Sequence, residues 1–253
     1  MIDVHCHLEQ KDFDKDRQML IDKLRGKLNA VITCCANPTD FEKTIAIVKN
    51  NTGFVFATAG LHPEYVEINE EEMQNFIEKI RENKTWLVGI GEIGLDYYWV
   101  KDERLREKQA LIFRIFIDLA RKLKMPVVIH ARDAFEDAIK ILEEENAKQV
   151  LMHMFGARHL LQKVISNGWF ISLNTIVLRS KKHKKIARDI SLENLMLETD
   201  SPWLHPDGGK KRNTPLSIEI VAKKIAEIKK IDVQEVIRAT DKNAVSFFGL
   251  RIR

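Results

Sequence analysis

Pro126-Val127-Val128-Ile129-His130 is the stretch that decides the fold class. It is a short run rich in β-branched residues, which predicts a buried strand, and it ends on a histidine. Helical periodicity occupies the segments on both sides of it, Glu103 to Leu123 and Asp133 to Glu145. Because a strand between two helices is typical of a parallel sheet with crossover helices, this part of the sequence predicts an α/β fold.

The same alternation extends outward along the chain in both directions. The predicted strands lie at 2–4, 30–33, 54–59, 87–90, 127–129, 150–152, 169–172 and 195–197. This number of strand-helix units predicts a (β/α)8 barrel of the TIM type, and the 253 residues of the chain are close to the ~250 typical of one such barrel. We therefore expect residues 1–253 to form a single domain. An amphipathic helix over 233–248, with Val236, Ile237, Val245 and Phe248 facing the barrel and Asp232 as N-cap, is expected to complete it.

Side chains that bind metals follow the predicted strands. His5 and His7 are two residues apart, so in a strand they point to the same face. The complete set of candidate ligands is His5, His7, Glu92, His130, His153 and Asp200. Because the carboxyl ends of barrel strands meet on one face, we expect these ligands to converge on a single site. A mixed set of imidazoles and carboxylates suits zinc, manganese, iron or cobalt better than a pure magnesium site.

Other side chains near these ligands are candidates for supporting roles. Glu198 lies two residues before Asp200, which predicts a carboxylate beneath the metals that holds a ligand in place. Arg132 lies two residues after His130, where its guanidinium could bind phosphate oxygens or form an ion pair with a ligand carboxylate. Tyr97, Tyr98 and Trp99 follow Glu92 in a loop, where they could stack on nucleobases or simply pack.

The net charge does not identify a partner, because 41 Lys plus Arg against 37 Asp plus Glu leave only +4. Basic residues are nevertheless concentrated in two runs, Arg179–Arg188 and Lys210–Arg212. Both runs follow late strands and should emerge on the ligand-bearing face. There they would draw a polyanion toward the site or form an ordinary solvated surface.

The chain has no run of about 20 apolar residues and no secretory pattern at its start, so the expectation is a cytoplasmic protein without a membrane span. The cysteines are Cys6, Cys34 and Cys35. Neighbouring strand positions point in opposite directions, which disfavours a disulfide framework. We expect buried thiols.

Short motifs occur in order along almost the whole chain. They are Ile2-Asp3-Val4-His5-Cys6-His7, Gly60-Leu61-His62-Pro63, Gly91-Glu92-Ile93-Gly94-Leu95-Asp96-Tyr97, Pro126 through His130 to Ala134, and Leu197-Glu198-Thr199-Asp200-Ser201-Pro202. This ordered set resembles the TatD family of metal-dependent hydrolases. That family is a branch of the amidohydrolase-like barrels and includes enzymes described as deoxyribonucleases.

The resemblance implies a site for two divalent metal ions. In it His5, His7 and Asp200 hold one ion, His130 and His153 hold the other, and Glu92 bridges them. Zinc, manganese and magnesium all remain candidates. The resemblance also places His62 in the substrate pocket and a motif containing Arg212 near its mouth, so Arg212 is expected to contact the substrate.

The expected function is hydrolysis of DNA phosphodiester bonds by a metal-activated water, with Glu92 and Asp200 as catalytic residues. Asp200 could accept the proton of the water or act only as a ligand. One alternative is hydrolysis of an ester or amide, for example removal of an aminoacyl group from transfer RNA. Another is a metal-stabilised barrel that binds a partner without catalysis. DNA is the expected substrate, and no protein partner can be inferred.

Overall fold

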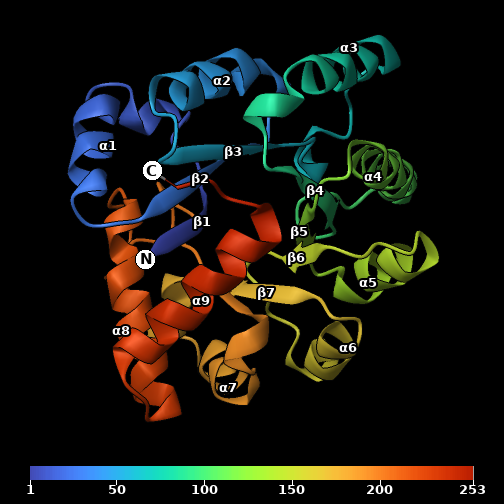
Figure 1. The fold of residues 1–253 in the computed structure, drawn as a ribbon. Coiled ribbons are helices and arrows are strands. Elements are labelled where there is room, and N and C mark those ends of the chain that lie inside the picture. The colour runs from blue at the N-terminus through green and yellow to red at the C-terminus, as the bar shows by residue number, and fades with distance from the viewer. Residues whose placement is uncertain (253) are drawn as a thin grey trace.

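The computed structural model describes residues 1–252, whose strands form a parallel sheet curled into a barrel with the helices outside (Figure 1). Each strand pairs with the next along the chain. The strands are β1 (Ile2–Cys6), β2 (Ala30–Cys35), β3 (Val55–Ala59), β4 (Gly89–Asp96), β5 (Val127–Arg132), β6 (Val150–Met152), β7 (Phe170–Leu173) and β8 (Leu195–Leu197). The predicted (β/α)8 barrel is thus confirmed.

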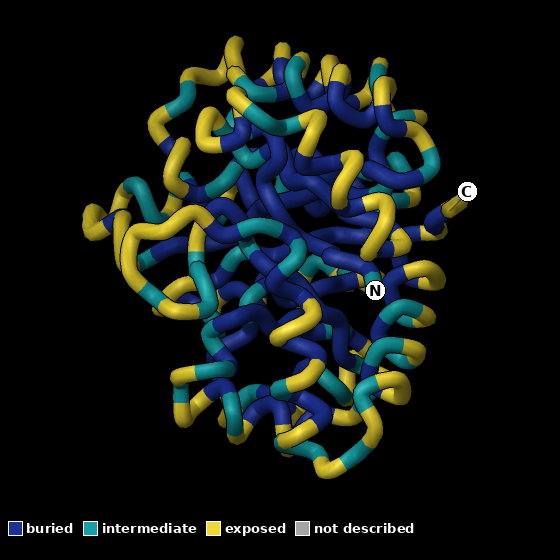
Figure 2. Tube along the Cα trace, turned by 90° about the vertical axis from the view of Figure 1, so that its left-hand side faces the viewer, coloured by how far each residue is buried: buried dark blue, intermediate teal, exposed yellow. Residues whose placement is uncertain are grey.

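Helices connect successive strands on the outside of the barrel, and two more helices follow β8. The helices are α1 (Arg17–Arg25), α2 (Phe41–Asn50), α3 (Glu70–Glu82), α4 (Glu103–Leu123), α5 (Phe135–Glu144), α6 (Leu161–Ser166), α7 (Lys181–Asp189), α8 (Ile218–Lys229) and α9 (Val233–Phe248). The strands are mostly buried, whereas most exposed residues lie on the helices and loops around them (Figure 2). Within residues 1–252 every helix is too short or too polar to cross a lipid bilayer.

The seam between β1 and β8 is joined at the carboxyl end of the strands. The backbone N–H of Asp200 donates to the carbonyl of His5 at 2.9 Å, and that of His7 donates to the carbonyl of Ser201 at 2.7 Å. Residues from the two ends of the sequence therefore lie side by side at the opening of the barrel.

Helix α9 lies across the opposite end of the barrel (Figure 1). The Asn243 amide donates to the carbonyls of Leu192 and Leu195 at 2.7 and 2.8 Å, and Asp241 accepts from the backbone N–H of Ile2 at 2.8 Å. The predicted N-cap is confirmed, because the Asp232 side chain accepts from the Gln234 N–H at 2.6 Å.

The apolar face of α9 closes a core inside the barrel. Phe247 and Phe248 belong there to one buried cluster with Val4, Val128 and Met196. The prediction for Val245 was wrong, because 37% of this side chain is exposed. The buried face of α9 is formed by Val236, Ala244, Phe247 and Phe248, and Val245 lies off that face. All three cysteines are buried and free, as expected.

Candidate metal centre

Irregularities in two strands carry the first ligands of the candidate centre. The β1–β2 register shifts between Asp3 and Cys6, and the β4–β5 register shifts between Ile90 and Ile93. His5 and Glu92 lie in these β-bulges. Bulges re-aim side chains and are common next to active sites. The sequence placed Glu92 at the end of its strand, but β4 continues past it to Asp96.

Glycines permit this path of β4. A Cβ on Gly91 would lie 2.7 Å from the backbone oxygen of Val128 on β5. Gly94 has a φ of +144°, and a Cβ there would lie 2.0 Å from the carbonyl oxygen of His130. Any larger residue would push β4 and β5 apart, so these glycines hold Glu92 and His130 at close range.

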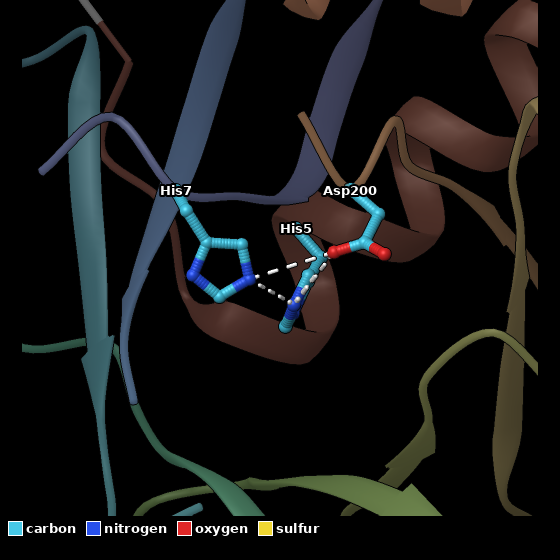
Figure 3. Close-up of side chains that lie close together, drawn as sticks. All are labelled: His5, His7 and Asp200. Carbon is cyan, nitrogen blue, oxygen red and sulfur yellow. Dashed lines mark hydrogen bonds and ion pairs between the residues drawn. The ribbon is translucent and has the colours of Figure 1, made fainter. Parts of the chain in front are cut away.

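His5, His7 and Asp200 form one group of ligands (Figure 3). The Nε2 atoms of the two histidines lie 3.1 Å apart, and Oδ1 of Asp200 lies 3.5 Å from Nε2 of His7 and 3.8 Å from Nε2 of His5. Asp200 has a φ of +55°, a left-handed backbone conformation that is uncommon for residues with side chains. All these atoms point at the same space, as a shared cation requires.

The Glu92 carboxylate lies between this group and a second one. Its Oε2 atom lies 3.4 Å from Nε2 of His5 and 4.0 Å from Nε2 of His7. Its Oε1 atom lies 2.8 Å from Nδ1 of His130 and 3.5 Å from Nε2 of His153. The structure therefore brings the six predicted ligands together, with one oxygen of Glu92 facing each group.

Buried acceptors orient the histidines. Nδ1 of His7 lies 3.0 Å from the carbonyl of Cys34 and 3.1 Å from Oε1 of Glu9. A carbonyl oxygen can only accept, so Nδ1 carries the hydrogen and Nε2 presents its lone pair to the site. His130 is held in the same way by Asp96, at 2.9 Å from its Nε2.

Glu198 holds His153. Its Oε2 atom lies 2.9 Å from Nδ1 of His153 and accepts from Ser172 at 2.5 Å, while Oε1 accepts from the amide of Asn174 at 3.0 Å and from the backbone of Met154 at 3.1 Å. These bonds leave Nε2 of His153 facing Glu92. Lone pairs from three oriented imidazoles, aimed at buried carboxylates, are a donor set that fits divalent cations.

The electrostatics of the centre also favour bound positive charge. Burial opposes the charged form of His153, yet the Glu198 and Glu92 carboxylates outweigh it and raise the pKa of His153 to about 10. Burial alone would raise the pKa of Glu92, but His153 and His5 hold it well below its usual range. Without a metal, protons on the imidazoles neutralise these carboxylates.

His62 lies at the edge of the second group. Its Nδ1 atom accepts from the backbone N–H of Glu64 at 3.1 Å. Burial, and then the neighbouring His130, lower the pKa of His62 to about 3, so the ring is neutral. The hydrogen is therefore on Nε2, which lies 3.2 Å from Nδ1 of His130 and 3.9 Å from Oε1 of Glu92. His62 can also be grouped with Glu92 and His130 as a ligand, but in this tautomer it is a donor.

Arg132 has an exposed guanidinium stacked on aromatic rings. Its Cζ atom lies 3.8 Å from the ring centre of Tyr98 and 5.5 Å from that of Trp99. Within residues 1–252 no carboxylate pairs with it. The alternative of an ion pair to a ligand carboxylate is thus not observed. Tyr97 makes a contact within the protein, since its hydroxyl donates to Asp137 at 2.9 Å.

Arg212 departs most from the sequence-based expectation of substrate contact. Its guanidinium forms a bidentate ion pair with Asp16, at 2.6 and 2.7 Å, and also donates to the carbonyl of Asp12 at 2.8 Å. The structure thus gives Arg212 a partner on the loop before α1. The lysines of the other basic run, Lys181, Lys182, Lys184 and Lys185, have no ion pair in the described part of the chain.

Two carboxylates that contact candidate ligands were not predicted from the sequence, Glu9 and Asp96. Glu9 lies two residues after His7, and this spacing was the available signal, since it is the one that indicated Glu198. Asp96 lies within a recognised motif, but only the pairing of β4 with β5 places it beside His130.

Fold and site together define a metal-dependent hydrolase built on a (β/α)8 barrel. The chain belongs to the family described as TatD related DNase, whose model matches residues 2–249. Human "Deoxyribonuclease TATDN3" is 32% identical over 261 residues, covering 98% of this chain and 94% of that protein. "Uncharacterized metal-dependent hydrolase MJ1582" of Methanocaldococcus jannaschii is 33% identical over 252 residues, covering 99% and 98%. The fold matches the crystal structure of YJJV, a TatD homolog from Escherichia coli, with a TM-score of 0.90 at 22% identity and 98% coverage of both chains.

Proposed function

We propose that this protein is a deoxyribonuclease that hydrolyses DNA phosphodiester bonds with two divalent cations. The observation that carries the proposal is the position of Glu92, with Oε1 facing His130 and His153 and Oε2 facing His5 and His7. A relative named as a deoxyribonuclease, 32% identical over 98% of the chain, supports the choice of DNA.

The ligands divide into two sets under this proposal. His5, His7 and Asp200 would hold one ion, His130 and His153 would hold the other, and Glu92 would contact both. Bound ions of this kind lower the pKa of a water and neutralise charge on phosphate oxygens. Zinc or manganese suits the nitrogen-rich donors better than magnesium does. Cleavage assays with each of the three metals decide between them.

The protein's own groups would complete the reaction. Oδ1 of Asp200 faces the histidines, so its other oxygen would be free to accept the proton of the attacking water. Nε2–H of His62 is a donor beside Glu92 and would bind a phosphate oxygen of the substrate. The Arg132 guanidinium at the end of β5 would bind the next phosphate along the strand.

The test is release of nucleotides from 5′- and 3′-labelled single-stranded DNA. Metal-stripped protein is resupplied with Mg²⁺, Mn²⁺ or Zn²⁺, and the Glu92→Ala variant is assayed beside it. We expect cleavage that depends on metal and is lost in the variant together with metal content. No cleavage with any metal would refute the nuclease. Hydrolysis of acyl esters such as aminoacyl-tRNA under the same conditions would then identify an acyl hydrolase.

A further inference from the structure

Exposed aromatic rings flank the candidate metal centre on two sides. Tyr98 and Trp99, which follow β4, are 43% and 58% exposed, and Trp203, which follows β8, is 47% exposed. Burial of large aromatic side chains stabilises a fold, so rings left in solvent around one opening indicate a binding surface. The carboxyl ends of β4 and β8 carry these rings on the same face as the metal ligands.

Trp203 is joined to the first ligand group. Its ring centre lies 4.7 Å from that of His7, with the planes inclined at 67°, an edge-to-face contact. Its backbone N–H donates to the carbonyl of Asp200 at 3.0 Å. The indole is therefore held beside the ion site of His5, His7 and Asp200 while about half of it stays open to solvent.

Tyr98 and Trp99 are joined to the second ligand group through one carboxylate. Oδ1 of Asp96 accepts from the backbone N–H groups of Tyr98 and Trp99 at 2.9 and 2.8 Å. Its other oxygen, Oδ2, lies 2.9 Å from Nε2 of His130. The turn that carries the two rings is thus fixed relative to a metal ligand, and Arg132 stacks on the Tyr98 ring at 3.8 Å.

We propose that Trp203 and the Tyr98–Trp99 pair are stacking subsites for the two bases on either side of the scissile phosphate. This inference rests on the proposed phosphodiesterase function. A phosphate at the metal centre would lie between the rings, so its neighbouring bases would reach one ring each. Every base offers a flat face, so such subsites bind without regard to sequence. In a duplex those faces are covered by stacked neighbours, and the site therefore takes unpaired strands.

The experiment measures binding of single-stranded oligonucleotides made resistant to cleavage by phosphorothioate linkages, with Mg²⁺ present. In one set of strands the bases are intact, and in the other they are replaced by abasic residues. The proteins are the unmodified chain, Trp203→Ala, Trp99→Ala and the double variant. Leu111→Ala is the matched control, because Leu111 is also exposed, at 60%, but lies on the outer helix α4.

We expect removal of the bases to weaken binding to the unmodified chain at least about tenfold, and each tryptophan variant to lose part of this difference. The double variant should bind both strands with nearly equal affinity, and Trp203→Phe should recover most of the lost affinity. Equal affinity of the unmodified chain for intact and abasic strands would overturn the inference. So would an unchanged preference in the double variant.

The cleavage assay distinguishes failure of the stacking subsites from failure of the proposed nuclease function. Metal-dependent cleavage of DNA without any preference for intact bases would refute the stacking subsites and leave the nuclease standing. A clear preference for intact bases without cleavage by any metal would refute the nuclease. Duplex DNA bound as tightly as single strands would also count against the subsites.

Discussion

Nδ1 of His153 lies 2.9 Å from Oε2 of Glu198, and both side chains are buried. This contact fixes the ring of a candidate metal ligand from behind. Carboxylates that accept from metal-bound histidines typically contribute about 10- to 100-fold to metal affinity. Glu198→Gln should therefore weaken metal binding by about this factor. Titration calorimetry of the metal-stripped protein measures it, with the exposed Glu193→Gln as control. Equal affinity in Glu198→Gln and the unmodified chain would contradict the role.

Binding of metal should release protons near neutral pH. The pKa of His153 in the metal-free protein is raised to about 10, because Glu198 and Glu92 outweigh the opposing effect of burial. A group is protonated below its pKa, so His153 carries a proton at pH 7 that a cation must displace. Affinity should rise about tenfold per pH unit for each proton released. Calorimetry in buffers of different ionisation enthalpy measures the release of protons. A metal affinity that does not change between pH 6 and pH 8 would refute the prediction.

The two arginines predicted to contact substrate should behave differently. Arg132 is exposed and stacked on Tyr98, whereas both ends of the Arg212 guanidinium bind Asp16. We expect Arg132→Ala to raise the KM for DNA about tenfold, the effect of losing a charged hydrogen bond. Arg212→Ala should change KM less and lower the free energy of unfolding by about 1 kcal/mol or less. Steady-state kinetics and urea unfolding measure both, and a larger KM effect at Arg212 would restore its place in the substrate pocket.

Asn243 should contribute to stability and not to metal binding. Its amide donates to the carbonyls of Leu192 and Leu195 and so attaches α9 to the barrel. Loss of both bonds leaves acceptors unpaired, which typically costs about 1–3 kcal/mol. Asn243→Ala should lower the urea midpoint accordingly, while the exposed Lys242→Ala should not. A midpoint equal to that of the unmodified chain would show that these two hydrogen bonds do not stabilise the fold.

The barrel was predictable because each strand is a short apolar run and each helix has its own periodicity. The ends of the strands were harder to predict from the sequence. The apolar pattern at β4 stops at Glu92, a charged residue, yet the strand continues to Asp96 because histidines from other strands compensate the buried charge. A pattern read locally contains no information about such partners.

The same limitation explains Arg212. Its basic neighbours indicated a surface for polyanions, whereas its actual partner, Asp16, lies 196 residues away in the sequence. The candidate metal ligands were easier to find, because their residue types and their position after strands follow from the chemistry and from the barrel itself. The exposure of Tyr98, Trp99 and Trp203 could be seen only in the folded structure.

Helix α9 has a consequence for how the chain matures during synthesis. Through Asp241 it binds the first residues of β1, and through Asn243 it binds the segment that leads into β8. His5 and Asp200 face each other only when these two strands adjoin. We therefore expect a ribosome-bound chain to lack a finished cation site until α9 has emerged, so that metal is bound only after synthesis has passed this helix.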